Sequence, residues 1–384
     1  MATVYAIRCP DYTQIPEKIG VLLTIMGGIE QFVRPDERIV LKPNLLAAMK
    51  PEQAGTTHPS IVAAVGRLTK QAGAIPILID SPGSGYPHTE KTLNKVYRVT
   101  GMYAAAEEAG IEASLDIRYQ TVPYPEGRYV KRLEVLTPIL EADGVLNLCK
   151  LKTHGFLGMT GAVKNSFGII PGLTKPGYHA NLKTPGPFAG MCLDLVSFLA
   201  PRLSIMDAVI GMEGMGPQNG TPRQIGWLFA SASPLALDCV AGHIMGLKRT
   251  QNPILLEAEK RGMQPHRIEQ VELVGAKLDE LRVPNFKLPA TILSGLGSKS
   301  MALFGPVIQN ALTLRPEVIT DRCVGCGFCR DACPVQVIAM VEKRAVINPK
   351  HCIRCYCCHE MCPEKAVELK QGILYRFIKP AGAV

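Results

Sequence analysis

The C-terminal part of the chain carries the same cysteine pattern twice. The first copy runs from Cys323 to Pro334 and the second from Cys352 to Pro363, and both read C-x-x-C-x-x-C-x-x-x-C-P. In this spacing three thiolates of one copy wrap around one [4Fe–4S] cluster, while the fourth thiolate reaches the other cluster. The two-residue gaps suit a tight loop whose sulfurs point inward, and each proline ends its loop. The pattern therefore predicts two [4Fe–4S] clusters.

The spacing divides the cysteines into two sets of predicted iron ligands. The first set is Cys323, Cys326, Cys329 and Cys362, and the second set is Cys333, Cys352, Cys355 and Cys358. Disulfide bonds and zinc sites are the alternative uses of so many cysteines, but neither explains the doubled register. Cys357 lies outside both sets, and we expect it to be a free, small apolar thiol.

Residues 314–374, which contain both copies, resemble the bacterial-type two-cluster ferredoxin module. The resemblance implies two related halves, each with a short hairpin and a helix, and the segments Val337–Met340 and Ala366–Leu369 repeat after the cysteines. Nine lysine and arginine residues against seven carboxylates give this module a net charge of +2, unlike the acidic surface of many free ferredoxins. We therefore expect a module docked on its own enzyme, with binding to an acidic partner as the alternative.

The composition predicts a globular protein of two or three domains. The chain has 384 residues, of which 47% are hydrophobic and 20% charged. Its net charge of +9 is spread along the sequence without a basic arm, which argues against nucleic-acid binding but favours an anionic ligand. No apolar run approaches the ~20 residues of a membrane span, and the N-terminus does not read as a signal peptide. Because exposed clusters need reduced thiols, we expect a cytoplasmic protein of an organism that lives largely without oxygen.

Residues 1–313 alternate between short apolar strands and helices. The predicted strands are 38–41, 75–79, 144–148, 203–206 and 225–230. One helix is predicted to begin at Pro59, another to cover 89–109 with Gly101 as a candidate break, and a third to run from Pro234 to Met245. This order favours an α/β fold with a mainly parallel sheet and helices on both faces. The predicted units are the α/β domain (1–313), a small α+β ferredoxin-like domain (314–374) and a tail (375–384), with the join between Gly295 and Pro316.

Polar side chains follow four of these strands at the point where each strand ends. They are Lys42 and Asn44, then Asp80, then Lys150, Lys152 and His154, and finally Asp207. The carboxyl ends of parallel strands meet at one edge of the sheet, where loops and helix N-termini form a ligand crevice. We therefore expect a shared, exposed site for a ligand or cofactor at this edge. Unrelated, solvated loop charges are the alternative.

The segment from Lys150 to Asn165 has the densest chemistry outside the cysteines. Lysine and histidine bind carboxylates, phosphates or a developing oxyanion, and His154 can donate a proton near neutral pH. Lys164 and Asn165 are expected to open the next helix, close to the same edge. We predict that Lys152 and His154 are catalytic and that Lys150, Lys164 and Asn165 bind the ligand. Surface lysines flanking a buried strand are the alternative.

Two glycine-rich loops are candidate anion sites. The loop 80–85 includes Gly83 and Ser84 and could present amides to a phosphate, although Pro82 removes one donor and the spacing is not that of a P-loop. A tight turn explains this loop equally well. The loop 211–220 carries Glu213, a candidate hydrogen-bond acceptor or catalytic general base, and a plain connection is again the alternative.

Six phrases of the α/β part together resemble an uncharacterised-domain family, domain of unknown function 362. They are Leu41–Leu46, Thr57–Pro59, Asp80–Gly83, Lys150–His154, Thr160–Asn165 and Met212–Pro217. Members of this family often carry a two-cluster ferredoxin module, as this chain does. The resemblance implies an α/β domain in an iron–sulfur redox protein of anaerobic bacteria or archaea, and it implies no substrate.

These features favour an iron–sulfur oxidoreductase. The clusters transfer single electrons, whereas most organic reductions need two, so the crevice would hold either an anionic substrate or a two-electron carrier such as FMN or another flavin. A redox partner of the ferredoxin or flavodoxin type is expected. Two alternatives stay open, namely a non-catalytic electron carrier or cofactor-maturation protein, and a non-redox enzyme with structural or sensory clusters. A strongly polar crevice would favour turnover over a carrier role.

Overall fold

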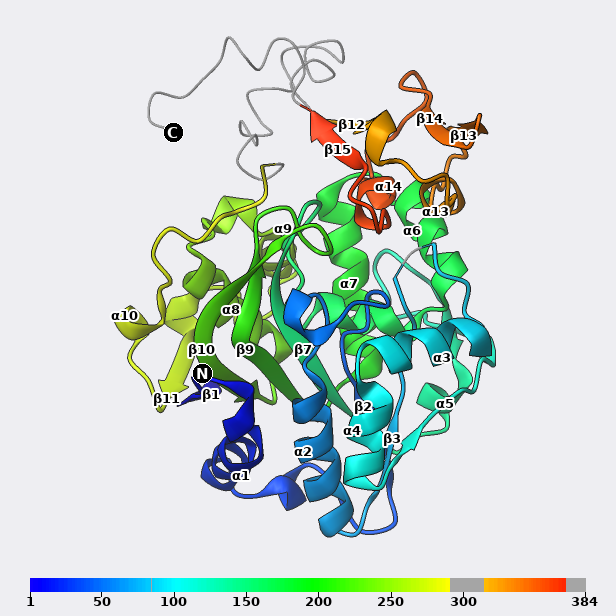
Figure 1. The fold of residues 1–384 in the computed structure, drawn as a ribbon. Helices are drawn as coiled ribbons and strands as arrows, with labels where there is room; N and C mark the ends of the chain where they lie inside the picture. Colours follow the sequence, from blue (N-terminus) through cyan, green and yellow to red (C-terminus); the bar gives the residue numbers. More distant parts are fainter. Residues whose placement is uncertain (84, 291–313, 371–384) are drawn as a thin grey trace.

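The computed structural model describes residues 1–83, 85–290 and 314–370, and its centre is a nine-stranded sheet (Figure 1). Along the sheet the strands are β11 (Val271–Val274), β1 (Ala2–Arg8), β10 (Thr221–Ser231), β9 (Leu203–Glu213), β7 (Gly144–His154), β2 (Arg38–Lys42), β3 (Ile75–Leu78) and β4 (Glu112–Ala113), and β8 (Gly158–Met159) pairs with β7. The ladders β11–β1, β9–β7, β7–β2, β2–β3 and β3–β4 are parallel. The predicted α/β fold with a mainly parallel sheet is confirmed.

β10 departs from the parallel arrangement. It runs antiparallel to both of its neighbours, β9 and β1. β9 leads into β10 through a short loop at 214–220, and a hairpin connection of this kind reverses the chain direction. The carboxyl end of β10 therefore lies at the opposite edge of the sheet from the predicted ligand site.

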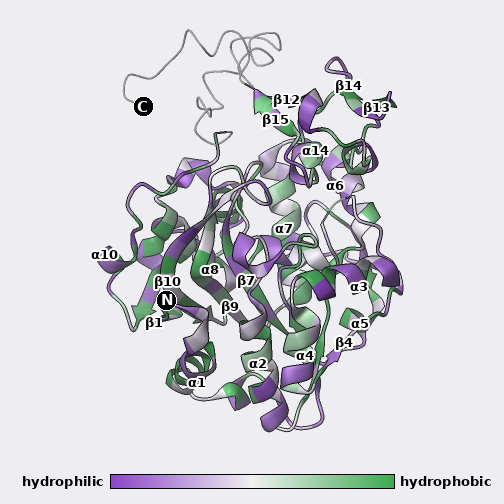
Figure 2. Ribbon diagram, viewed as in Figure 1, coloured by the Kyte–Doolittle hydropathy of each residue, from purple (hydrophilic) through white to green (hydrophobic). Residues whose placement is uncertain are grey.

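Helices cover both faces of the sheet. One face carries α1 (Ile15–Ile25), α2 (Pro59–Gln71), α3 (Glu90–Val99) and α4 (Met102–Ala109), and the other carries α7 (Pro185–Leu199), α8 (Pro234–Met245) and α9 (Pro253–Lys260). In β2, Ile39 and Leu41 pack on the first face and Val40 on the second, as the two-residue period of a strand requires. Figure 2 shows the central strands mainly green, with purple gathered on outer helices such as α3 and α10 (Leu278–Leu281).

Shorter elements complete the α/β part, and the last of the turns below lies in the C-terminal residues. They are α5 (Thr137–Leu140), α6 (Lys175–Asn181), the hairpin of β5 (Tyr119–Pro123) and β6 (Arg132–Leu136), and the 3₁₀ turns Tyr12–Gln14, Ile29–Gln31, Pro51–Gln53, Lys164–Ile169, Gly172–Thr174, Arg249–Gln251, Ile268–Gln270 and Thr320–Arg322. None of the helices in the described residues is long and apolar enough to cross a membrane.

The predicted helix boundaries follow from local sequence signals. α2 begins at Pro59, and the His58 ring accepts a hydrogen bond from the Ser60 amide at its start. The predicted break at Gly101 is confirmed, because this residue adopts φ +75° and separates α3 from α4. A positive φ is easily reached by glycine, and it ends one helix before the next can begin.

β7 and β9 are longer than the sequence predicted. Each has 11 residues, so Lys150, Lys152 and His154 lie within β7 and Asp207 lies within β9. The predicted strands ended where polar residues began, because a buried strand is expected to be apolar. Here the polar side chains find hydrogen-bond partners inside the protein, and the strands continue through them.

Residues 314–370 form a small module at the carboxyl end of β7 (Figure 1). β12 (Arg315–Val318) pairs with β15 (Val367–Lys370), and β13 (Ile338–Val341) pairs with β14 (Arg344–Ile347). Each cysteine motif contributes one short helix, α13 (Phe328–Asp331) and α14 (Cys357–Glu360). The predicted join at 295–316 and the predicted tail at 375–384 fall largely or wholly outside the described residues.

An apolar contact joins the module to the α/β domain. Ala47, Met49, Tyr86 and Met212 of the domain form one buried cluster with Ala332, Cys355, Cys357 and Met361 of the module. The ring of Tyr86 lies 5.4 Å from that of Phe328. The loop that contains Gly83 and Gly85 reaches this contact, since a Cβ on Gly85 would lie 2.7 Å from the Ala332 Cβ. Glycine is therefore required where the loop meets the module.

We predict that Gly85→Ala destabilises the protein by about 1–3 kcal/mol, because it adds a clash with Ala332 to a φ of +91° that alanine rarely adopts. The measurement is the urea dependence of unfolding of anaerobically prepared protein. Gly177→Ala is the matched control, because a Cβ at Gly177 has no neighbour within 4 Å and its helical φ suits alanine. Equal urea midpoints of unfolding for the two variants would contradict a role for Gly85 in the contact between the domain and the module.

Candidate functional site

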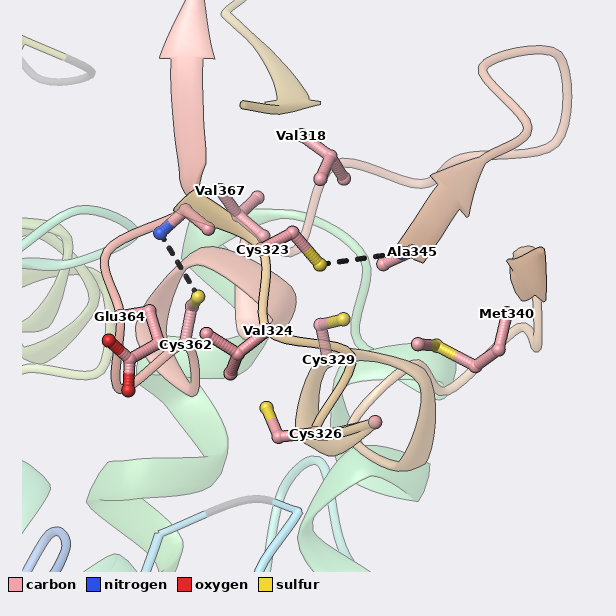
Figure 3. Close-up of a pocket in the computed structure, with 12 residues that line it drawn as sticks. Val318, Cys323, Val324, Cys326, Cys329, Met340, Ala345, Cys362, Glu364 and Val367 are labelled. Atoms are coloured by element: carbon pink, nitrogen blue, oxygen red, sulfur yellow. Dashed lines mark hydrogen bonds between the residues drawn. The ribbon is translucent and has the colours of Figure 1, made fainter. Parts of the chain in front are cut away.

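The structure gathers the two predicted ligand sets around two separate cavities. The first cavity is lined by Cys323, Cys326, Cys329 and Cys362, and its roughly 330 Å³ of space without atoms is partly open to solvent (Figure 3). The second is lined by Cys333, Cys352, Cys355 and Cys358, and its roughly 300 Å³ is likewise partly open to solvent. Each cavity thus takes three thiols from one motif and one from the other, which is the exchange that the spacing predicted.

Backbone amides donate hydrogen bonds to several of these sulfurs. The donor–acceptor pairs are Val337 N to Cys333 Sγ (3.4 Å), Ala366 N to Cys362 Sγ (3.1 Å) and Ala345 N to Cys323 Sγ (3.5 Å). The first two pairs occupy equivalent positions in the two motifs. Such donors stabilise thiolate charge and adjust the potential of an iron–sulfur cluster. No group of three or more His, Cys, Asp or Glu side chains in the described residues is arranged to hold a single metal ion. The thiols instead line the two cavities in sets of four, which is the number of cysteine ligands that a [4Fe–4S] cluster takes.

Cys357 lies beside the second set without lining its cavity. Its side chain is fully buried in the apolar contact between module and domain, in the same cluster as Met49 and Met361. A hydrogen bond to Cys355, together with burial, raises the pKa of the Cys357 thiol well above its usual value. These contacts support the expectation of a free, neutral, apolar thiol.

At the carboxyl edge of the sheet, Lys42 and Asp80 form a buried ion pair. Lys42 Nζ lies 2.8 Å from Asp80 Oδ1, and the backbone N–H of Leu45 donates to Asp80 Oδ2 at 2.8 Å. Both side chains are almost fully buried. The pair therefore ties the end of β2 to the end of β3, and both charges are already compensated.

Lys150 and Asp207 form a second buried pair, between β7 and β9. Lys150 Nζ lies 2.6 Å from Asp207 Oδ2 and 2.9 Å from the Tyr12 hydroxyl. Asp207 also accepts hydrogen bonds from the Tyr12 hydroxyl at 3.0 Å and the His58 backbone N–H at 2.9 Å. Burial lowers the pKa of Lys150, and the charge of Asp207 opposes that shift. This set holds the N-terminus of α2 against the sheet.

Lys152 is buried against neutral oxygens. Its Nζ donates to Asn44 Oδ1 and to the Gly55 carbonyl, each at 2.6 Å. Asn44 Nδ2 in turn donates to Asn165 Oδ1 at 2.8 Å, and Asn165 Nδ2 donates to Asn147 Oδ1 at 2.7 Å. Burial lowers the pKa of Lys152 well below its usual value, and the positive charges of Lys164 and Lys150 lower it further.

His154 is held in one tautomer at the end of β7. Its Nδ1 accepts the backbone N–H groups of Phe156 and Leu157 at 3.1 and 3.3 Å, so the proton of the neutral ring is on Nε2. Burial lowers the pKa of His154 well below its usual value, and the charge of Lys164 adds to this effect. His154 Nε2 lies 3.5 Å from the Glu360 Oε1 atom of the module.

Glu360 is the acidic member of this edge, and it comes from α14. Burial raises its pKa to about 7, although the charges of Lys164 and Lys152 act in the opposite direction. Its Oε1 atom is buried and has no hydrogen-bond partner among the described residues. A carboxyl group thus lies at the contact between the cysteine module and the sheet edge.

Lys164 faces the same place from the first residue of the 3₁₀ turn Lys164–Ile169, as expected for the start of a helix. Its Nζ lies 5.6 Å from the centre of the Phe167 ring, and no ion pair involves it in the described parts of the chain. Asp238 fixes the turn before it by accepting the Ala162 and Val163 amides at 2.6 and 3.2 Å. We call Lys152, His154, Lys164 and Glu360 the seam cluster.

The structure corrects the expectation of an exposed crevice. Lys42, Lys150, Lys152 and His154 are at most 1% exposed, because the loops and the module cover the sheet edge. The predicted site residues of this edge are brought together, but most of them are internal.

Two predicted ligand groups are engaged elsewhere. In the loop 80–85, the N–H groups of Ser81 and Gly83 already donate to the carbonyls of Gly168 and Leu46, so the tight-turn alternative describes it better than an anion site. Ser84 lies outside the described residues. Glu213 is buried, and its carboxylate accepts the Lys287 backbone N–H at 3.1 Å instead of contacting the seam cluster.

Three residues of this edge, Glu360, Lys175 and the half-buried Tyr12, were missed. The only sequence signal for Glu360 is its position between Cys358 and Cys362, two predicted iron ligands. Tyr12 gives no local signal, because its partner Asp207 is 195 residues away. Lys175 donates to the Ser81 carbonyl at 2.8 Å and to that of Pro82, and burial lowers its pKa to about 7.

We predict about eight iron atoms and eight acid-labile sulfides per chain after anaerobic reconstitution, because each cavity presents four thiols. Cys358→Ala should lose about half of the iron, whereas Cys357→Ala should keep both clusters. Iron and sulfide analysis makes the measurement. Loss of iron from the Cys357 variant alone would mean that the spacing selected the wrong thiol.

We also predict that Lys150→Met lowers the free energy of unfolding by about 3–5 kcal/mol, since it leaves Asp207 buried without its ammonium partner. Lys18→Met is the control, because Lys18 pairs with Glu17 at the surface, where a pair contributes about 0–1 kcal/mol. Urea unfolding of the two variants tests the difference. Equal stabilities would contradict a structural role for the Lys150–Asp207 pair.

Comparisons with known proteins identify both parts of the chain. Residues 39–243 match the family model described as Domain of unknown function (DUF362), and residues 315–363 match a 4Fe-4S dicluster domain. The chain is 35% identical over 285 residues to the Thylakoid-associated protein sll1697 of Synechocystis sp., covering 72% of this chain and 83% of that protein. The solved structure of the lactate racemase apoprotein from Thermoanaerobacterium thermosaccharolyticum is similar over 64% of this chain and 57% of that one, at 11% identity and a TM-score of 0.40. With a family model that spans more than half of its length and a relative of this identity, the chain belongs to the family described as Domain of unknown function (DUF362), with a 4Fe-4S dicluster domain at residues 315–363.

Proposed function

We propose that this protein is an iron–sulfur oxidoreductase that acts on a small anionic ligand at the seam cluster. The observation that carries the proposal is the position of Glu360. Its carboxyl group lies 3.5 Å from His154 Nε2, while Cys358 and Cys362, two residues away on either side, line the second and first cavities. The segment that would hold the clusters therefore contacts the anion site through Glu360, which lies between two of the cysteines.

The charges of the seam cluster support an anionic ligand. The positive charge of Lys164 lowers the pKa of both Lys152 and His154, which means that these groups repel one another when protonated. The acceptors of Lys152 are neutral oxygens, and a pKa of about 7 leaves Glu360 only partly ionised at neutral pH. An anion beside Lys164 would relieve this repulsion, and the low dielectric of a buried site strengthens that attraction.

The chain's own groups would then have distinct tasks. Lys164, which is partly exposed, would bind the anion, and the Nε2–H group of the neutral His154 ring would donate a hydrogen bond to it. Lys42, Lys150 and their carboxylate partners would hold the strand ends in place. When bound, the [4Fe–4S] clusters would supply single electrons.

An anionic substrate is better supported than a bound flavin. The glycine-rich loop that could approach a flavin phosphate uses its Ser81 and Gly83 amides for backbone hydrogen bonds and packs against the module. The polar character of the seam cluster also supports turnover over a purely electron-carrying role. A cytoplasmic location and an anaerobic host stay part of this proposal.

We predict that Lys164→Met weakens binding of the anion at least about tenfold without loss of iron, because Lys164 is partly exposed and forms no ion pair in the described residues. The measurement is the rise in melting temperature of the anaerobic, iron-loaded protein on addition of inorganic phosphate, acetate or succinate. At least one of these probes should stabilise the native sequence and fail to stabilise the variant.

The matched control is Lys183→Met, which removes the same charge from an exposed position outside the seam cluster. It should respond to the probes as the native sequence does. A probe that stabilises both variants equally would show that the anion binds elsewhere. Loss of iron from the Lys164 variant alone would mean that Lys164 supports the module and not a ligand.

A further inference from the structure

The outer face of the module contains a groove away from the seam cluster. We call it the outer groove, and it is lined by Val335, Gln336, Val337, Ile338, Ala339, Val346, Asn348 and His351. It offers about 1010 Å³ of empty space open to solvent. Its wall is mainly aliphatic, and Val346 is 51% exposed there.

The outer groove and the second cysteine cavity share a wall. Val335, Val337 and Ile338 line both of them. A protein that fills the groove would therefore be separated from the cavity of Cys333, Cys352, Cys355 and Cys358 by a single layer of side chains. Electron transfer between two proteins requires a short separation of this kind. Because only an electron moves, no substrate needs to enter the module.

A basic residue adjoins the groove. Lys350 is exposed and precedes His351, a residue of the groove lining, and it forms no ion pair within the described residues. Lys343 and Arg344 lie at the turn of the same hairpin, where Arg344 donates to the carbonyls of Thr320 and Cys323 beside the first cavity. On the rest of the module several bases are neutralised locally, as in the pairs Arg322–Glu368, Arg330–Asp331 and Lys370–Glu317. The uncompensated charge at this face suits an acidic partner.

The equivalent place on the other half of the module is different. Counting from the last cysteine of each motif, Glu364 takes the position of Val335 and Ala366 that of Val337. Glu364 and Ala366 line the first cavity, so a carboxylate stands there in place of an aliphatic wall. An acidic partner would be repelled by Glu364 and attracted by Lys350, and this difference selects one half of the module.

We propose that the outer groove is the docking site of a small, acidic, one-electron carrier protein that exchanges electrons with the second cysteine set. One electron leaves the reduced carrier and one is gained by the module, with no bond made or broken. The docking site rests on the iron–sulfur part of the proposed function and is independent of what binds at the seam cluster. Electrons would enter at the face of the module opposite to the sheet edge.

Two matched pairs of variants test the docking site. Val346→Asp places a negative charge in the groove, whereas Val341→Asp makes the same change at an equally exposed valine of the same hairpin outside the groove lining. Lys350→Glu reverses a rim charge, and Lys365→Glu makes the same change at the position equivalent to Gln336 on the other half. All four positions are exposed, so iron content and absorption spectrum should be unchanged.

The probe is an acidic flavodoxin, used both for binding titrations at low salt and as a reductant in stopped-flow experiments. Val346→Asp and Lys350→Glu should weaken binding and slow reduction of the module about tenfold, and added salt should reduce the difference. The Val341 and Lys365 variants should stay within about twofold of the native sequence.

Equal effects of the groove and control variants would overturn the proposal, because the partner would then sense only the net charge. A strong effect of Val324→Asp, next to the exposed Cys326, with none from Val346→Asp would place the docking site at the first cavity instead. Failure of the anion tests at Lys164 would leave these measurements unaffected, so the two proposals are tested separately.

Discussion

Four lysine side chains of the described residues are buried at the carboxyl edge of the sheet, and each Nζ atom needs oxygen acceptors there. Lys42 and Lys150 are paired with the carboxylates of Asp80 and Asp207, whereas Lys152 and Lys175 donate mainly to amide and backbone oxygens. A buried charge without such partners costs several kcal/mol. The loops after β2, β3 and β7 are therefore fixed by the lysines, and an edge that is usually an open crevice becomes a firm platform for the module.

The polar groups of the glycine-rich loop 80–85 are also used to hold the structure together. Its sequence suggested a cradle for phosphate, but its carbonyl oxygens accept from Lys175 and its amides bond to neighbouring backbone. The small size of Gly83 and Gly85 lets Leu46 and Ala332 come close. Glycine permits close approach of any neighbour, and whether that neighbour is a ligand or another part of the chain depends on long-range packing.

The sequence was most informative where a pattern is complete within a short stretch. Cysteine spacing specifies which thiols can meet around one cavity, and the alternation of strands and helices specifies that strand ends such as Lys42, Lys150 and Asp207 share one edge. Burial could not be predicted, because it depends on what lies above that edge. The direction of β10 and the role of Tyr12 depend on partners far away in sequence, and a polar residue within β7 looks like the end of a strand until its acceptor is known.

The segment from Cys355 to Cys362 explains how a docked module can serve a site on the sheet. Within it, Cys358 and Cys362 face the two cavities, and Cys357 and Met361 belong to the apolar contact with the domain. Cys355 belongs to both the second cavity and this contact. Between them, the His359 carbonyl accepts from Asn219 at 2.6 Å and Glu360 lies against His154. Cavity-lining and domain-facing residues thus alternate within a single helical turn and its flanks. The module cannot shift on the sheet without moving thiols of both sets. The backbone of this segment therefore fixes the distance between the cavities and the seam cluster. A fixed short distance is the structural condition for electron transfer within one chain.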